Sequence, residues 1–166
     1  NNIIAVNAGI DESNADDHFI FWPKDIQEKA NDIWKFLRSY YKLKKVGVII
    51  TDSKTFPLKW GIVGTSVSFC GFKGLYDYRG KKDIFGRVLK MSQINIAEAL
   101  AVSAVLEMGE ADEMMPLCII KNIPKIEFRD RVPTKKELKS LLINIEDDVY
   151  APILTKAKWK KGSAGK

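Results

Sequence analysis

The sequence predicts a fold of the α+β or α/β class, in which helices pack on a mixed sheet. Two observations predict it. Short apolar runs typical of buried strands occur at residues 3–6, 46–50, 61–72 and 116–120. Apolar side chains recur at steps of three and four along residues 23–41 and again along an alanine-rich segment that opens at Ser92, which predicts two amphipathic helices.

The predicted helices differ in how they pack. The stripe on the first helix places Trp34 in the core, and it consists of Ile26, Ala30, Ile33, Trp34, Leu37 and Tyr41. The second helix packs closely through small residues, and its stripe is Ala97, Ala101, Ala104 and Met108. Strand, helix and strand in the order of residues 3–50 favour a right-handed crossover with parallel pairing.

Near the C-terminus, Thr134 and Glu137 have the spacing of a capping box. We expect a short helix there, from Thr134 through Leu142. A length of 166 residues, with 46% hydrophobic and 29% charged residues, fits one ordinary globular domain. We place that domain at residues 1–155 and a basic tail at residues 156–166.

The net charge of +6 is spread along the chain and concentrates only in the tail. A solvated tail and a nucleic-acid arm are both compatible with it. Aromatic residues do not alternate with basic ones elsewhere, so nucleic acid is not the expected partner. No apolar run reaches the roughly 20 residues of a membrane-spanning helix, and the first residues do not resemble a signal peptide. We expect a cytoplasmic protein without a membrane partner.

Few residues are suited to nucleophilic or zinc chemistry. Cys70 and Cys118 lie in apolar segments without metal-like spacing, so we expect buried, reduced thiols. His18 is the only histidine, which leaves little for a Ser-His-Asp triad or a histidine-rich zinc site. Any catalysis must rely on carboxylates, amides and hydroxyls.

Two acidic turns follow the first two predicted strands. Asp11 comes after residues 3–6, and Asp52 with Ser53 comes after residues 46–50. The carboxyl ends of strands in an open α/β sheet face the crevice where ligands bind, and Mg²⁺ or Mn²⁺ prefers such oxygen ligands. Asn14 could donate its amide to a nearby phosphate oxygen. Acidic residues also simply form turns, but the two acids together favour a metal site.

Four motifs occur in order along the chain. They are Asn-Ala-Gly-Ile-Asp-Glu-Ser-Asn at residues 7–14, Val-Gly-Val-Ile-Ile-Thr-Asp-Ser at residues 46–53, Asp-Tyr-Arg-Gly with Asp83 and Phe-Gly-Arg at residues 77–87, and Ala-Glu-Ala-Leu-Ala leading to Met-Gly at residues 97–109. Together they resemble the coenzyme F-420:gamma-glutamyl ligase family, including its bacterial folate-metabolism gamma-glutamate ligase branch. The resemblance runs from about residue 3 to residue 123, and we expect the family's N-terminal segment to be missing upstream of Asn1.

The resemblance implies a gamma-glutamyl ligase-like fold in an intertwined homodimer. It implies a GTP-dependent ligase that adds L-glutamate by a gamma-linked amide bond to a carboxylate on a deazaflavin or folate-like acceptor, through an acyl phosphate. Mg²⁺ or Mn²⁺ would be the cofactor, and K⁺ an optional further cation. The alternative is a non-catalytic nucleotide- or metal-binding module, or an assembly module, that retains the fold.

The resemblance also assigns residues. It implies that Asp11, Asp52, Ser53 and Glu110 are metal ligands and that Asn14 and Gly109 contact the nucleotide. The family continues after the Asp-Ser pair with Phe-Gly-Arg before its proline, whereas this chain has Lys54-Thr55-Phe56. Lys54 would then replace the charge of the missing arginine without its bidentate fork.

A further group of charges lies in the third motif. Arg79 and Arg87 flank Asp83. The group is either an anion clamp for a polyglutamyl or phosphate group or a structural ion-pair network.

Overall fold

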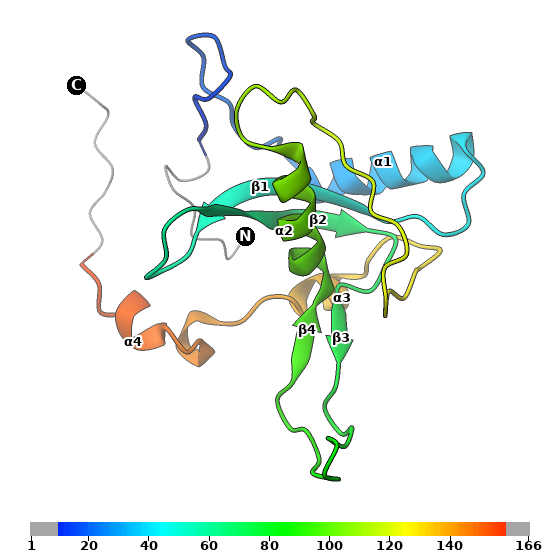
Figure 1. Ribbon diagram of the computed structural model, residues 1–166, viewed down its shortest axis with the longest axis vertical. Coiled ribbons are helices and arrows are strands. Elements are labelled where there is room, and N and C mark those ends of the chain that lie inside the picture. Colours follow the sequence, from blue (N-terminus) through cyan, green and yellow to red (C-terminus); the bar gives the residue numbers. More distant parts are fainter. Residues whose placement is uncertain (1–9, 159–166) are drawn as a thin grey trace.

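The computed structural model describes residues 10–158 and confirms an α+β arrangement (Figure 1). In chain order the elements are α1 (Ile26–Tyr40), β1 (Val48–Thr55), β2 (Ile62–Cys70), β3 (Leu75–Asp77), β4 (Gln93–Asn95), α2 (Ile96–Met108), α3 (Lys135–Lys139), the 3-10 helix η2 (Ile145–Asp147) and α4 (Ala151–Leu154). The predicted strand at residues 3–6, and with it the expected crossover, lies outside the described residues, as does most of the basic tail. The division at residue 155 stays a prediction.

Two antiparallel hairpins form the sheets of the described chain. β1 pairs with β2 from Val48 opposite Cys70 to Thr55 opposite Ile62, with a bulge between Ile50 and Thr51. β3 pairs with β4 and forms an arm that projects away from the other elements in Figure 1. Every strand pairing within residues 10–158 is antiparallel.

The β1–β2 hairpin is covered on both faces by helices. Phe69 belongs to a core cluster with Phe72, Ile96 and Ala97, the last two from α2. The next residue, Cys70, packs instead with Ala30 and Trp34 of α1. Successive strand residues point to opposite faces, so α1 and α2 lie on opposite sides of the hairpin.

The first predicted helix and the strand within residues 61–72 are confirmed as α1 and β2. Trp34 is buried as expected, and its indole N–H donates to the Val46 carbonyl at 3.0 Å. Cys70 is buried, whereas Cys118 is only half-buried, and both thiols are free. No helix within residues 10–158 is long and apolar enough to cross a membrane.

Three predicted boundaries were wrong. β1 continues to Thr55 because its pairing with β2 carries on past the bulge, so Asp52 and Ser53 lie in a strand and not in a turn. α2 begins at Ile96 and not at Ser92, because residues 93–95 pair with β3 and the Asn95 side chain caps the helix. α3 ends at Lys139, three residues short of Leu142.

The predicted strand at residues 116–120 is also wrong. Nothing within residues 10–158 pairs with this segment. Its apolar side chains do not reach the core either, since Leu117 is 87% and Ile119 83% exposed. A strand needs a hydrogen-bonded neighbour as well as apolar residues, and the sequence pattern reports only the second.

α2 approaches β2 closely at Gly64. A β-carbon there would lie 2.4 Å from the Ala101 carbonyl oxygen and 2.6 Å from a Val105 methyl carbon. Glycine is therefore required at this position by the packing of the helix on the strand.

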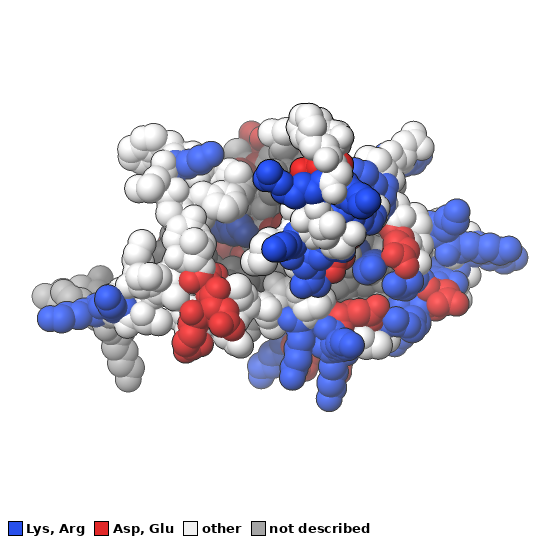
Figure 2. Space-filling model, turned by 90° about the horizontal axis from the view of Figure 1, so that it is seen from below, with Lys and Arg blue, Asp and Glu red and all other residues white. Residues whose placement is uncertain are grey.

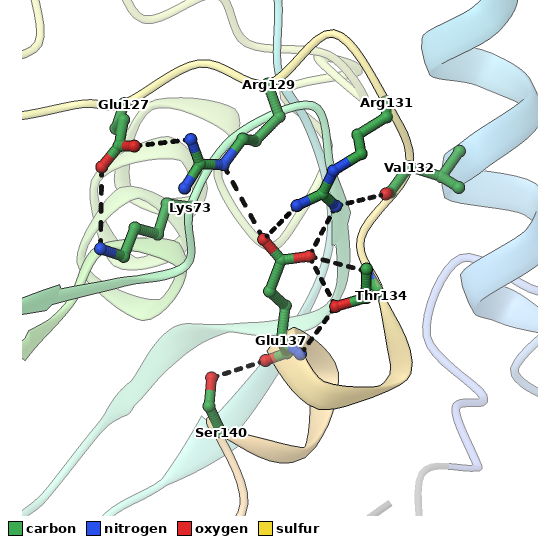
Figure 3. A network of polar contacts seen from close by, with 8 residues as sticks. All are labelled: Lys73, Glu127, Arg129, Arg131, Val132, Thr134, Glu137 and Ser140. Atoms are coloured by element: carbon green, nitrogen blue, oxygen red, sulfur yellow. Dashed lines mark hydrogen bonds and ion pairs between the residues drawn. The ribbon is translucent and has the colours of Figure 1, made fainter.

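The capping box that the sequence predicts is present and is reinforced by arginines (Figure 3). The Glu137 carboxylate accepts hydrogen bonds from the Thr134 backbone N–H at 2.8 Å and from both terminal nitrogens of Arg131 at 2.7 and 3.0 Å. Arg129 lies 3.8 Å away and also pairs with Glu127 at 2.6 Å. The hydrogen bond from Arg131 is the main reason that the pKa of Glu137 falls to about 2.

We predict that Gly64→Ala destabilises the fold by about 2 kcal/mol, because a methyl group cannot fit between α2 and β2. Urea unfolding measures this. In the matched control, Gly80→Ala adds the same methyl group where no atom lies within 4 Å, at a φ of 82°. The loss of stability in this control should come only from backbone strain and amount to about 1 kcal/mol. Equal losses in the two variants would contradict the close approach of α2.

We predict that Glu137→Gln lowers the free energy of unfolding at pH 7 by about 1 kcal/mol, the scale of a helix cap. The pKa of Glu137 in the folded state, about 2, lies below its ordinary value of 4.5. Its carboxylate therefore stabilises the fold above about pH 4.5, and this contribution is lost as the pH falls toward 2.

The measurement is urea unfolding at pH 7, 4 and 3. The difference between wild type and Glu137→Gln should shrink as the pH falls. Glu146→Gln, at an exposed carboxyl in η2, is the control and should behave as wild type at each pH. A difference that is the same at pH 7 and pH 3 would show that the charge of Glu137 contributes nothing.

Candidate functional site

A hollow of about 910 Å³ opens beside β1. Its walls come from the loop before α1, from β1 itself and from the loop after α2, and Figure 1 shows both loops on the same side of β1. Every residue that the sequence assigned to a metal or a nucleotide lines this hollow, and so does Lys54. These residues are Asp11, Asn14, Asp52, Ser53, Gly109 and Glu110.

Asp52 is held on both of its carboxylate oxygens. The indole N–H of Trp22 donates to Oδ2 at 2.7 Å, and the backbone N–H of Ser53 donates to Oδ1 at 2.8 Å. Trp22 lies in the loop just before α1, and the sequence analysis gave it no role. It fixes the orientation of the Asp52 carboxylate toward the hollow.

The loop after α2 is joined to β1 through Ser53. The Ser53 hydroxyl donates to Glu110 Oε2 at 3.0 Å. Gly109, before Glu110, has a φ of 78°, and a β-carbon there would lie 2.2 Å from the Glu113 carboxyl carbon. The backbone N–H of Ala111 donates to Glu113, which lowers the pKa of that carboxyl. This turn brings Glu110 to the hydroxyl of Ser53.

The loop before α1 reaches the same place. The Asn14 side-chain amide donates to the Ala111 carbonyl at 2.9 Å. Asp11 Oδ1 accepts the backbone N–H of Ser13 at 2.8 Å, and this bond is the main reason that the pKa of Asp11 is lowered. Asp11 therefore remains a carboxylate at neutral pH.

The donor chemistry fits a hard divalent cation. Asp11, Asp52 and Glu110 contribute carboxylate oxygens and Ser53 a hydroxyl, the ligand types that Mg²⁺ and Mn²⁺ prefer. Within residues 10–158, however, no three His, Cys, Asp or Glu side chains gather into one metal-binding group. The Asp52 and Glu110 carboxylates are instead engaged by Trp22 and Ser53. The ligand types therefore suit a cation, but each of the three carboxylates accepts a hydrogen bond from a different protein group.

Arg79, Asp83 and Arg87 lie away from the hollow, in the β3–β4 arm. The ion-pair partner of Arg79 is Asp77, at 2.6 Å, whose pKa falls to about 2 because of hydrogen bonds from that arginine. Asp83 accepts the backbone N–H groups of Phe85 and Arg87 and so shapes the turn. Of the two alternatives stated from the sequence, the structural ion pair is present for Arg79, but its partner is Asp77 and not Asp83.

Seen from the end of this arm, lysine and arginine side chains gather over the centre and right of the face, with acidic side chains among them (Figure 2). The role of Arg79, Asp83 and Arg87 as an anion clamp stays a prediction. The arm does not contribute to the lining of the hollow.

Residues 1–122 match the family model described as F420-0:Gamma-glutamyl ligase. This chain belongs to the F420-0:gamma-glutamyl ligase family. Within the F420-0:gamma-glutamyl ligase family motifs, the segments at residues 10–14, 50–53 and 108–109 lie together in the lining of the hollow. The family resemblance stated from the sequence is thereby confirmed.

Curated relatives share much of the chain. The protein named coenzyme F420:L-glutamate ligase from Methanococcus maripaludis strain C6 is 40% identical over 148 residues, which is 89% of this chain and 56% of the relative. Its namesake from Methanocaldococcus jannaschii is 40% identical over 138 residues, 81% of this chain and 55% of the relative. The protein of the same name from Methanopyrus kandleri is 37% identical over 150 residues, which is 89% of this chain and 58% of the relative. The chain thus spans a little over half the length of these members of the F420-0:gamma-glutamyl ligase family.

We predict that the indole N–H of Trp22 exchanges with solvent more slowly than that of Trp60, whose side chain is fully exposed. Asp52→Ala should speed exchange at Trp22 by about tenfold, since a hydrogen bond to a charged group contributes about 1.5–3 kcal/mol. Exchange of indole protons in ¹⁵N-resolved NMR spectra measures both rates.

Asp32→Ala is the matched control for this measurement. Asp32 is an exposed carboxylate on α1 that pairs with Lys35. The Asp32→Ala substitution should leave the exchange rate of the Trp22 indole proton unchanged. An unaltered Trp22 rate in Asp52→Ala would show that the bond does not hold the indole.

Proposed function

We propose that this protein is a ligase that adds L-glutamate, by a gamma-linked amide bond, to a carboxylate on a coenzyme F420-type acceptor, at the expense of GTP and with Mg²⁺ or Mn²⁺. The observation that carries the proposal is the hollow beside β1, where the metal and nucleotide residues implied by the family motifs lie together. The family of the chain and the names of its curated relatives support the reaction.

The proposed chemistry needs no protein nucleophile. The acceptor carboxylate attacks the γ-phosphorus of GTP, and GDP leaves as the acyl phosphate forms. The amino group of glutamate then attacks the acyl carbon, inorganic phosphate leaves, and the amine loses its proton to solvent. Catalysis of this kind rests on placing the reactants in line and offsetting their negative charge.

Each side chain of the hollow has a part in this scheme. Asp11 and Asp52 would hold one divalent cation, Ser53 and Glu110 would hold a second metal ion, and Asn14 and Gly109 would contact the nucleotide. The metal ions, when bound, supply positive charge against the phosphates. Lys54 would add a fixed positive charge at the wall of the hollow.

A second candidate is a non-catalytic module that binds a nucleotide or a metal, or that serves in assembly. One observation favours it. Lys54-Thr55-Phe56 stands where the family has Phe-Gly-Arg, so the arginine expected to grip a phosphate or the acceptor is missing.

A homodimer and a further K⁺ ion belong to the same proposal. The segment at residues 61–72, which contains β2, could extend a sheet across a two-fold axis. Light scattering tests the dimer, and a clean monomer would remove it from the proposal.

We predict that this chain binds GTP only in the presence of Mn²⁺ or Mg²⁺, as measured by isothermal titration calorimetry. Asp52→Asn should weaken binding by at least about tenfold, or about 1.4 kcal/mol, because it removes a charge that faces the cation. Asp32→Asn, at the exposed carboxylate of α1, should bind as wild type does.

Two results separate the candidates. Release of GDP that depends on both glutamate and the F420-type acceptor supports the ligase. Metal-dependent GTP binding without such release favours the binding module. Absence of metal-dependent GTP binding by the wild-type chain would rule out the ligase and a module that binds a nucleotide.

A further inference from the structure

Glu98, in the first turn of α2, is fixed in place from several directions. Its backbone N–H donates to the Asn95 side chain at 3.1 Å. Its carboxylate accepts the Thr65 hydroxyl at 3.0 Å and the backbone N–H of Ser66 at 3.3 Å. Thr65 itself is only 1% exposed. The Glu98 carboxylate therefore sits at a fixed point between α2 and β2.

Lys54 of β1 is the third group that contacts this carboxylate. Its ammonium lies 3.3 Å from Glu98 Oε2, with side-chain exposures of 21% for the lysine and 29% for the glutamate. The ammonium also lies 5.3 Å from the centre of the Phe56 ring. A lysine side chain has many rotamers in solution, and these contacts restrict this one to a single region.

Lys54 lines the hollow, whereas Glu98 does not. Among the described residues that form the lining, Lys54 is the single lysine or arginine, whereas the acidic residues are Asp11, Asp52, Glu110 and Glu113. An anionic group that enters so acidic a hollow meets repulsion from the carboxylates. Lys54 is the side chain that can offset it.

Asp52 lies two residues before Lys54 in β1, and residues two apart in a strand share a face. Without Glu98, the ammonium would be drawn to Asp52 and would neutralise a carboxylate proposed to hold the cation. Glu98 thus separates the positive and negative sides of the hollow.

We infer that Glu98 is a positioning residue that holds Lys54 at the wall of the hollow, where the ammonium binds an anionic group of the substrate. The group is a phosphate of the nucleotide or the carboxylate of the acceptor, both of which pair with an ammonium. This inference rests on the proposed function and adds to it the residue that orients the cationic side chain.

The test measures two affinities by calorimetry, that of GTP in the presence of Mn²⁺ and that of the F420-type acceptor alone. Lys54→Met and Glu98→Gln should each weaken the same one of the two by about tenfold. The affected ligand identifies the anion as phosphate or carboxylate. The double variant should bind this ligand no more weakly than Lys54→Met does, because the effects of substitutions at two coupled residues are not additive.

A purely structural Glu98 would behave differently. Glu98→Gln would then lower stability in urea but leave both affinities unchanged in the folded protein, and the inference would be overturned. If Glu98→Gln does not fold, Glu98→Asp keeps the charge and withdraws it from Lys54, and the same ligand should bind more weakly. Lys54→Arg keeps the charge and should retain most of the affinity.

Lys59→Met is the matched control, since Lys59 is exposed in the turn after β1 and does not line the hollow. It should bind both ligands as wild type does. If the wild type binds and Lys54→Met binds equally well, the inference fails while the proposed function stands. If the wild type binds neither ligand, the proposed function and the inference fail together.

Discussion

The pairing of β1 with β2 is the constraint on which the described structure depends. One cluster of the core lies under α2 and the other under α1, and alternate residues of this hairpin supply both. The absence of a side chain at Gly64 lets α2 come into contact with β2. The same contact brings Glu98 to Thr65 and Lys54, and it places the loop after α2 beside Ser53. The packing of the two helices and the arrangement of the polar site thus both depend on the β1–β2 hairpin.

Features set by nearby residues could be predicted from the sequence. The stripe of α1 and the capping box of Thr134 and Glu137 depend on neighbours within a few positions, and both are present. Contacts between distant segments could not be predicted. The bond from Trp22 to Asp52 spans 30 residues and that from Lys54 to Glu98 spans 44. Neither contact leaves a periodic pattern in the sequence. The apolar run at residues 116–120 likewise does not report whether another strand lies beside it.

Family motifs indicated which residues to consider together at the candidate site, although their spacing in the sequence gives no geometry. Asp11, Asp52 and Glu110 were assigned by resemblance and lie around one hollow. The motif that contains Arg79 and Arg87 was interpreted as either an anion clamp or a structural ion-pair network, and it forms a separate arm in which Arg79 pairs with Asp77. The motifs of one family can therefore lie at separate places in the fold, because their order in the sequence does not report which of them come together.

The bulge between Ile50 and Thr51 has a consequence for how this chain can vary in length. A shift of one residue in a strand moves every later side chain to the opposite face. An insertion or deletion within residues 51–54 would therefore move the side chains that follow it to the other face of the strand and disturb this part of the lining of the hollow. The turn at residues 56–61 lies beyond these side chains and is free of that restriction. Length variation in relatives should accordingly be confined to the turn, while the strand keeps its residue count.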